Sequence, residues 1–283
     1  KVQMNYALLL SLSLVSAEFS EDLARNFFLP LAAGAYSSDP QPCLSKALIN
    51  AKVSKQVTMK IEYFRDNGSG FTFYSEVDDV IGLVFRGTTD AVQLVTEITD
   101  TAFDSKVYFD DSGRTSKYFS DAFHTLWDGG LGDDLQALIA AYPNATLFVS
   151  GHSLGAALSS LATQHIAAMK LFPTDRIVLY NFGMPRTGDK VYANDHDSYI
   201  KESYRIVHER DMVVHIPPEA MSYRHHMTEV FYKNNMAPGK PYTICTEEED
   251  SKCSDQYIFD TSIIDHTHYY QTDIFFWGRG GCK

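Results

Sequence analysis

Residues 147–155 read LFVSGHSLG, and this stretch decides the fold. Residues 147–150 form an apolar run of strand length, and a largely apolar stretch with few helix breakers extends from Leu154 to Lys170. The residues between them match G-x-S-x-G, a pattern that holds a serine exposed on a strained turn between a strand and a helix. The alternative is an ordinary turn with a helix-capping serine. The strand and helix on either side favour the strained turn, with Ser153 as a nucleophile.

Other apolar runs of strand length alternate with helical segments on both sides of this turn. They are Val80–Phe85, Arg176–Tyr180 and Ser203–His208. Unbroken apolar runs are typical of strands buried in a parallel sheet, and alternation with helices predicts β-α-β units. We therefore expect one α/β domain over residues 18–283, with a mostly parallel central sheet flanked by helices. A helix over Ser20–Tyr36 should be kinked or split by Pro30.

The first residues have the pattern of a signal peptide. Lys1 supplies a positive charge, residues 6–15 are apolar, and the small residue Ala17 precedes acidic residues. The apolar run is too short to span a bilayer, and the alternative is a buried N-terminal helix. We expect residues 1–17 to be a cleaved signal peptide, the protein to be secreted, and no segment to be transmembrane.

The cysteine content is typical of an oxidising compartment. Four cysteines without a C-x-x-C pair predict two disulfides, for which three connectivities exist. Cys245 and Cys253 flank a polar loop that could close locally, which would leave Cys43 with Cys282. Two sequons, at Asn67 and Asn144, are candidate glycosylation sites.

Composition and charge exclude several classes of protein. The 283 residues are 45% hydrophobic and 21% charged, an ordinary globular balance. The net charge of -12 repels nucleic-acid phosphates and anionic head groups, so we expect no nucleic-acid partner. His225-His226 and His266-x-His268 lack further ligands at the spacing of zinc sites. We expect no metal and no cofactor, and the sequence does not specify an oligomeric state.

A serine nucleophile needs a base and an acid that orients the base. After this kind of turn they follow in the order acid, then histidine. Asp211 is the favoured acid, because it comes shortly after the strand Ser203–His208, where α/β sheets build their sites. No strand delivers the other candidate acids, which are Asp189, Asp195 and Asp197. The candidate bases are His266 and His268, with His225 and His226 as competitors, and position alone does not choose among them.

Five motifs, in order, resemble those of the fungal-type class 3 lipases. They are Val84–Thr88, Gly151–Gly155, Phe182–Gly188, Arg205–Asp211 and Asp265–Tyr270. The resemblance extends from about Leu23 to Cys282, and residues 29–37 resemble nematode members of the family. It implies an α/β-hydrolase fold with a short lid after the strand that ends at Phe85. It also places the acid at Asp211 and the base at His266. The pairs Cys43–Cys282 and Cys245–Cys253 resemble a related fungal feruloyl esterase branch.

The resemblance implies a secreted carboxylester hydrolase that forms an acyl-enzyme. His266 would take the proton of Ser153 as the serine attacks an ester carbonyl, and Asp211 would orient and stabilise the imidazolium. The backbone N–H of Leu154 would be one oxyanion-hole donor, and Thr88 the second, through its N–H and its hydroxyl. We interpret His152 and Arg86 as structural.

The expected lid decides the substrate. Its apolar face would consist of Val92, Leu94, Val95 and Ile98, and the alternative is a plain core helix. An apolar lid predicts a triacylglycerol lipase acting on neutral acylglycerols at a lipid–water interface. The family's lipases often place a tryptophan in this helix, whereas Trp127 and Trp277 lie elsewhere. A feruloyl-type carbohydrate esterase therefore stays as the alternative, and a secreted lipid-binding protein without catalysis is the third interpretation.

Overall fold

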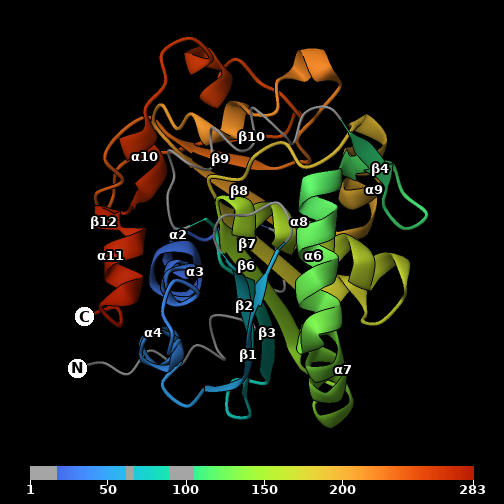
Figure 1. Ribbon diagram of the computed structural model, residues 1–283. Coiled ribbons are helices and arrows are strands. Elements are labelled where there is room, and N and C mark those ends of the chain that lie inside the picture. Colours follow the sequence, from blue (N-terminus) through green and yellow to red (C-terminus); the bar gives the residue numbers. More distant parts are fainter. Residues whose placement is uncertain (1–17, 62–66, 89–104) are drawn as a thin grey trace.

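A sheet of eight strands crosses the centre of the structure (Figure 1), a computed structural model that describes residues 18–61, 67–88 and 105–283. In spatial order the strands are β1 (Lys52–Lys60), β2 (Asn67–Ser75), β3 (Val80–Phe85), β6 (Thr146–His152), β7 (Ile177–Phe182), β8 (Glu202–His208), β9 (Glu229–Tyr232) and β10 (Thr243–Cys245). The strands from β3 to β9 pair in parallel, whereas β1–β2, β2–β3 and β9–β10 are antiparallel. The expected mostly parallel central sheet is confirmed. The expected signal peptide (residues 1–17) and the lid residues Val92, Leu94, Val95 and Ile98 lie outside the described residues.

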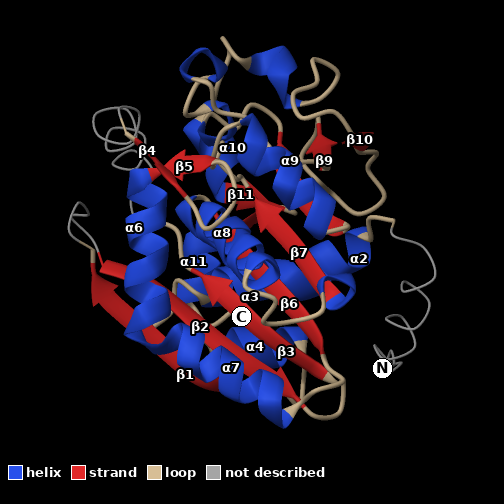
Figure 2. Cartoon of the chain, turned by 90° about the vertical axis from the view of Figure 1, so that its right-hand side faces the viewer, coloured by secondary structure: helices blue, strands red, loops and turns tan. Residues whose placement is uncertain are grey.

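Helices cover both faces of the sheet (Figure 1). One face carries α2 (Glu21–Leu23), the π-helical segment η1 (Ala24–Phe28), α3 (Leu29–Gly34), α4 (Gln41–Ala47) and α11 (Ile274–Arg279). The other carries α6 (Lys117–Leu126), the π-helical segment η3 (Trp127–Leu131), α7 (Gly132–Ala141), α8 (Leu154–Ala168) and α9 (Lys190–Tyr199). Figure 2 views the molecule from the side of α6 and α7.

The connections contain short elements. Five are helical: η4 (Thr174–Arg176), η5 (Val213–His215), η6 (Glu219–Met221), η7 (Ser254–Tyr257) and α10 (Ile263–Thr267). Two small antiparallel pairs join β4 (Lys106–Tyr108) to β5 (Arg114–Ser116) and β11 (His268–Tyr269) to β12 (Thr272–Asp273). No helix in the described ranges is both long enough and apolar enough to cross a membrane.

The central strand β6 contributes side chains to the two large hydrophobic cores, one on each face of the sheet. Successive side chains of a strand point to opposite faces of a sheet. Phe148 packs against Phe27, with ring centroids 5.1 Å apart, in the core under α3. Leu147 and Val149 lie in the other core, under α6 and α8. A run of consecutive apolar residues is therefore required, because both faces are covered.

The N-terminal helix is interrupted near the expected position. Ser20 caps it by accepting a hydrogen bond from the Leu23 N–H at 3.3 Å. The chain then runs through α2, η1 and α3 without a gap. Pro30 lies in the first turn of α3, directly after the π-helical segment, where a residue without an N–H interrupts the α-helical hydrogen-bond ladder.

Two disulfides fix the ends of this architecture. Cys43 in α4 is joined to Cys282, and Cys245 at the end of β10 is joined to Cys253. The first closes a loop of 239 residues and the second a loop of 8. These are the pairs that the resemblance implies.

Candidate active site

Ser153 occupies the sharp turn between β6 and α8. Its backbone has φ 61° and ψ -129°, in a region that costs a residue other than glycine about 1–3 kcal/mol. Its N–H donates to the Phe182 carbonyl oxygen at 2.9 Å. A β-carbon at Gly151 would lie 2.1 Å from the Gly155 carbonyl oxygen, and one at Gly155 would lie 2.2 Å from that of Phe85. The two glycines are therefore required for the close packing that holds this turn.

His266 and Asp211 meet at the carboxyl edge of the sheet. Nδ1 of His266 lies 2.9 Å from both carboxylate oxygens of Asp211, and both side chains are fully buried. Asp211 comes shortly after β8, and His266 lies in α10. Two backbone hydrogen bonds join the segments, from Ser262 to the Arg210 carbonyl and from Met212 to the Ser262 carbonyl. The acid and the base are thus fixed to each other by main-chain as well as side-chain contacts.

The surroundings of Asp211 favour its charged form. Its carboxylate also accepts hydrogen bonds from the Val213 N–H at 2.8 Å and the Tyr269 hydroxyl at 2.9 Å. Burial alone would raise the pKa of Asp211. The charge of His266 and the hydrogen bonds from His266, Val213 and Tyr269 together outweigh this effect of burial. They hold the pKa of Asp211 below its ordinary value. No role for Tyr269 is expected from the sequence. The only feature that could have indicated one is the aromatic pair Tyr269-Tyr270, which begins three residues after His266.

Gly183 lies close to all three candidate triad residues. It follows Phe182, whose carbonyl binds the Ser153 N–H. A β-carbon on Gly183 would lie 2.7 Å from Oδ2 of Asp211 and 2.8 Å from Nδ1 of His266. Nε2 of His266 is buried and has no hydrogen-bond partner among the described residues. The carboxyl ends of β6 and β8 thus bring the serine and the carboxylate, and α10 the histidine, close to Gly183 at the end of β7.

Thr88 and Leu154, the expected oxyanion donors, both lie near Ser153 in the chain or in space. Gly87 adjoins Ser153, because a β-carbon on Gly87 would lie 3.0 Å from Cβ of that serine. Thr88 follows Gly87 and is buried, and its hydroxyl has no hydrogen-bond partner within residues 18–61, 67–88 and 105–283. Leu154 is the first residue of α8, so its N–H lacks an acceptor within the helix.

The competing histidines and aspartates have other contacts. Nε2 of His225 lies 3.1 Å from the Met184 carbonyl, and the His226 ring stacks on the ring of His196. The half-exposed His268 contacts the Thr267 hydroxyl. The alternative acids have hydrogen-bond partners outside the candidate site. Asp189 caps α9, Asp195 accepts a hydrogen bond from the Ser112 hydroxyl, and Asp197 accepts one from the Met227 N–H.

Three carboxylates converge outside this site. Those of Glu219, Glu249 and Asp255 are close enough to share an ion. The buried guanidinium of Arg186 lies among them, 2.8 Å from Glu249, 3.4 Å from Asp255 and 4.0 Å from Glu219. Arg186 therefore already balances part of their charge. The sequons have exposed asparagines at Asn67 and Asn144, and their glycosylation stays a prediction.

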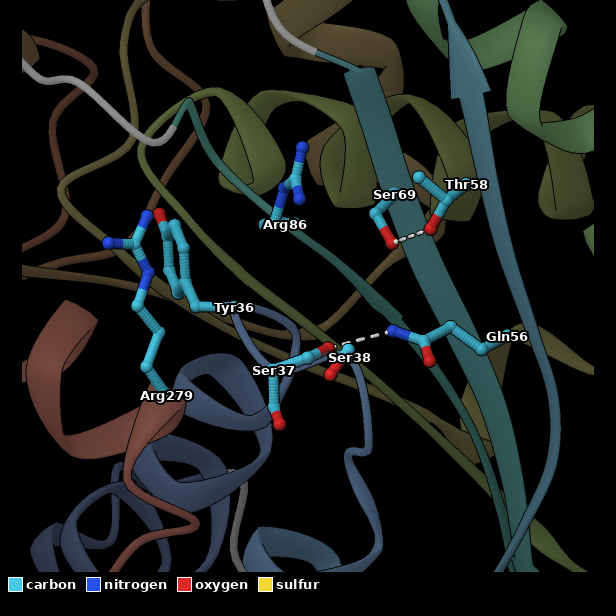
Figure 3. A pocket seen from close by; sticks show the side chains of 8 residues that line it. All are labelled: Tyr36, Ser37, Ser38, Gln56, Thr58, Ser69, Arg86 and Arg279. Carbon is cyan, nitrogen blue, oxygen red and sulfur yellow. Dashed lines mark hydrogen bonds between the residues drawn. The ribbon is translucent and has the colours of Figure 1, made fainter.

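A polar cleft of about 490 Å³ opens beside Tyr36 (Figure 3). Its described lining contains two guanidinium groups, from Arg86 and Arg279, and no carboxylate among the residues whose positions the structure gives. The remaining lining residues are Ser37, Ser38, Gln56, Thr58 and Ser69. The Arg86 side chain also donates to the Asn67 carbonyl. This cleft adjoins the candidate site, because a β-carbon on Gly87 would approach both the Tyr36 hydroxyl and Ser153.

The chain is similar in sequence and fold to known lipases. The family Lipase (class 3) matches residues 82–221. Lipase ZK262.3 of Caenorhabditis elegans is 30% identical over 94% of this chain and 83% of its own length. A lipase of Rhizopus niveus is 29% identical over 71% of this chain, which covers 50% of that protein. The triacylglyceride lipase structure from Rhizomucor miehei superposes with a TM-score of 0.78 at 25% identity, covering 91% of this chain and 97% of that one.

Proposed function

We propose that this chain, which belongs to the class 3 lipase family and is a serine ester hydrolase, is a secreted triacylglycerol lipase. Its catalytic triad would be Ser153, His266 and Asp211. The observation that carries this proposal is the buried His266–Asp211 pair beside the strained turn of Ser153. Secretion is supported by the two disulfides, which persist in oxidising compartments.

The three proposed triad residues would carry out acyl transfer in the following steps. Asp211 accepts a hydrogen bond from the Nδ1–H of His266, which holds the neutral imidazole in the tautomer with Nε2 unprotonated. Nε2 takes the hydroxyl proton of Ser153 as Oγ bonds to the ester carbonyl carbon. The tetrahedral intermediate then collapses, His266 protonates the departing alcohol, and a water molecule releases the acid from Ser153 by the same route. Asp211 stays charged throughout, because its surroundings stabilise the carboxylate.

The carbonyl oxygen gains negative charge in both tetrahedral intermediates. The Leu154 N–H at the start of α8 would be the first donor to it. The buried Thr88 hydroxyl and N–H would be the second. Leu154 is the first residue of α8, and Thr88 lies three residues after the end of β3. Loss of one such donor typically lowers kcat by about 10²–10³-fold.

Neutral acylglycerols are the proposed substrates. The net charge of -12 disfavours anionic lipid surfaces, and the Rhizomucor miehei neighbour is a triacylglyceride lipase. Acyl chains gain about 0.8 kcal/mol per buried methylene, so triacylglycerols with longer chains should be preferred until the site is filled. Phospholipase A activity should be low.

A feruloyl-type esterase is the second candidate. The polar cleft beside Tyr36 favours it, because hydroxyl and guanidinium groups could bind the sugar part of such a substrate. The deciding assay compares tributyrin, emulsified long-chain triacylglycerol and methyl ferulate, with Ser153→Ala as the inactive control. We expect both triacylglycerols to be hydrolysed faster than methyl ferulate. Turnover of methyl ferulate without activity on emulsified triacylglycerol would overturn the lipase assignment. Retained activity in a folded Ser153→Ala protein would overturn the triad.

A further inference from the structure

His152, the residue before Ser153, is hydrogen-bonded at both ring nitrogens. Nδ1 lies 2.7 Å from the Tyr36 hydroxyl, and Nε2 lies 2.8 Å from the His266 carbonyl oxygen. The ring is fully buried, and its centroid is 4.6 Å from that of the His266 ring. His152 therefore contacts both the main chain and the side chain of the proposed base.

These partners define the protonation of His152. A carbonyl oxygen only accepts hydrogen bonds, so Nε2 carries a proton and donates a hydrogen bond to the His266 carbonyl oxygen. Burial and the neighbouring His266 lower the pKa of His152 to about 3, so the ring is neutral at ordinary pH. A neutral imidazole has one N–H, and Nδ1 must therefore accept from the Tyr36 hydroxyl. The chain of donors runs in one direction, from Tyr36 to His152 to His266.

The contact supports a short element that has little stability of its own. α10 contains only five residues, and the carbonyl oxygens of its last turn have no N–H donor within the helix. The His266 carbonyl finds its donor in His152, at the end of the rigid strand β6. Tyr36, just after α3, holds the His152 ring in place through the hydrogen bond from its hydroxyl to Nδ1.

We propose that Tyr36 and His152 form a positioning relay that holds His266 at the distance and angle needed to take the proton of Ser153. This inference rests on the proposed function of His266 as the base, and it assigns His152 a role beyond the structural one expected from the sequence. The relay acts through His266 and touches no reacting atom. A displacement of about 1 Å in a catalytic group can lower the rate by about 10²-fold, so the relay affects kcat and leaves KM nearly unchanged.

The test separates hydrogen bonding from packing at position 152. His152→Gln keeps an N–H near the position of Nε2, His152→Asn keeps a polar group near Nδ1, and His152→Leu fills the space without polar groups. We expect kcat on a soluble p-nitrophenyl ester to fall about 10–100-fold in the Leu and Asn variants and to be largely restored in the Gln variant. Tyr36→Phe should have a smaller effect in the same direction, and none beyond that of His152→Leu in the double variant.

The control is His196, another fully buried histidine, whose Nε2 lies 3.1 Å from the Ser203 hydroxyl. His196→Leu should lower the melting temperature without lowering kcat of the folded fraction. Active-site titration of Ser153 with a fluorophosphonate gives that fraction. Equal kcat in wild type and folded His152→Leu, or equal losses in His152→Leu and His196→Leu, would overturn the relay.

A spectroscopic measurement keeps the relay testable if the proposed activity fails. The proton between Nδ1 of His266 and Asp211 should give a downfield NMR resonance. We expect this resonance to shift or broaden in His152→Leu, to return in His152→Gln, and to be unchanged in His196→Leu. An inactive wild-type enzyme would refute the proposed function alone, whereas an unchanged resonance in His152→Leu would refute the relay.

Discussion

Five of the buried histidines form two groups, and the charged neighbours of the two groups have opposite sign. The first region, the elbow pair, consists of His152 and His266 at the end of β6. The second, the β8 cluster, consists of His196, His225 and His226 beside β8. All five rings are buried. The elbow pair lies against the carboxylate of Asp211, which forms no ion pair with a lysine or arginine among the described residues.

Two guanidinium groups, those of Arg205 and Arg186, lie near His225 and His226 in the β8 cluster instead. Burial, followed by the charges of Arg205 and Arg186, holds the pKa of His225 well below its ordinary value. Nδ1 of His225 lies 3.6 Å from Glu249, but both oxygens of that carboxylate bind Arg186 at 2.9 and 2.8 Å. Burial thus makes an imidazole neutral, and an unshared carboxylate is what makes it a useful base.

The largest expected difference is between His266→Ala and His225→Ala. Removal of a triad histidine lowers kcat by about 10⁴–10⁶-fold, because no other group can take the serine proton. His225→Ala and His268→Ala should change kcat of the folded protein by less than about tenfold. The measurement is kcat on a p-nitrophenyl ester, corrected for folded fraction. A loss at His268 alone would mean that the base is assigned wrongly, and equal losses at His266 and His268 would remove the distinction between them.

The two carboxylates give the next comparison. Asp211→Asn should preserve the geometry but lower kcat by about 10⁴-fold, since an amide favours the wrong tautomer of His266. Glu249→Gln, which removes the carboxylate beside His225, should lower stability through its contact with Arg186 and leave kcat nearly intact. Similar losses of kcat in the two variants would contradict the assignment of Asp211 as the orienting acid.

The sequence predicts the elbow well and the sheet edges poorly, for physical reasons. Val80–Phe85 is β3 residue for residue, because a strand covered on both faces must be apolar throughout. β1 was not predicted: most of Lys52–Lys60 is polar and exposed, as is usual for an edge strand. β2 contains Gly68 and Gly70, where a β-carbon would collide with Ile61 and with the Val84 carbonyl, so its composition does not indicate a strand.

The candidate site shows the same division. A local pattern identifies Ser153, and the resemblance chooses Asp211 and His266 among similar residues. The contacts of Tyr36 and His152 are invisible in the sequence, because the two residues are 116 positions apart and meet only in three dimensions.

Tyr269→Phe tests the hydrogen bond from the Tyr269 hydroxyl to Asp211, and its expected effect on kcat is smaller. Its hydroxyl donates to Asp211 and helps to lower the pKa of that carboxyl, so its loss should raise this pKa and reduce kcat about tenfold or less. Because the folded-state pKa of Asp211 is depressed, the stability it confers is present above its unfolded pKa and is lost as pH falls. The acid limb of both stability and kcat should therefore move to higher pH in the variant. Superimposable pH profiles would show that this hydroxyl has no influence on the acid.

The β8 cluster should make the protein sensitive to acid without affecting catalysis. Burial, followed by the charge of Arg205, lowers the pKa of His226 to about 3, whereas in the unfolded chain a histidine has a pKa of about 6.5. Between these values the unfolded state binds the additional proton, so the unfolding free energy is unaffected above about pH 6.5 and decreases as pH falls below it.

A single such histidine contributes at most about 1.4 kcal/mol per pH unit. We expect denaturant unfolding of His226→Asn between pH 4.5 and 6 to show a slope against pH reduced by up to one proton, with kcat at pH 8 maintained. The matched control is His268→Asn, at a half-exposed histidine, which should keep the wild-type slope. If the unfolding free energy of His226→Asn keeps the wild-type slope against pH, the imidazole of His226 is already charged in the folded protein. In that case burial and Arg205 do not neutralise His226, and the contrast between the β8 cluster and the elbow pair cannot rest on that effect.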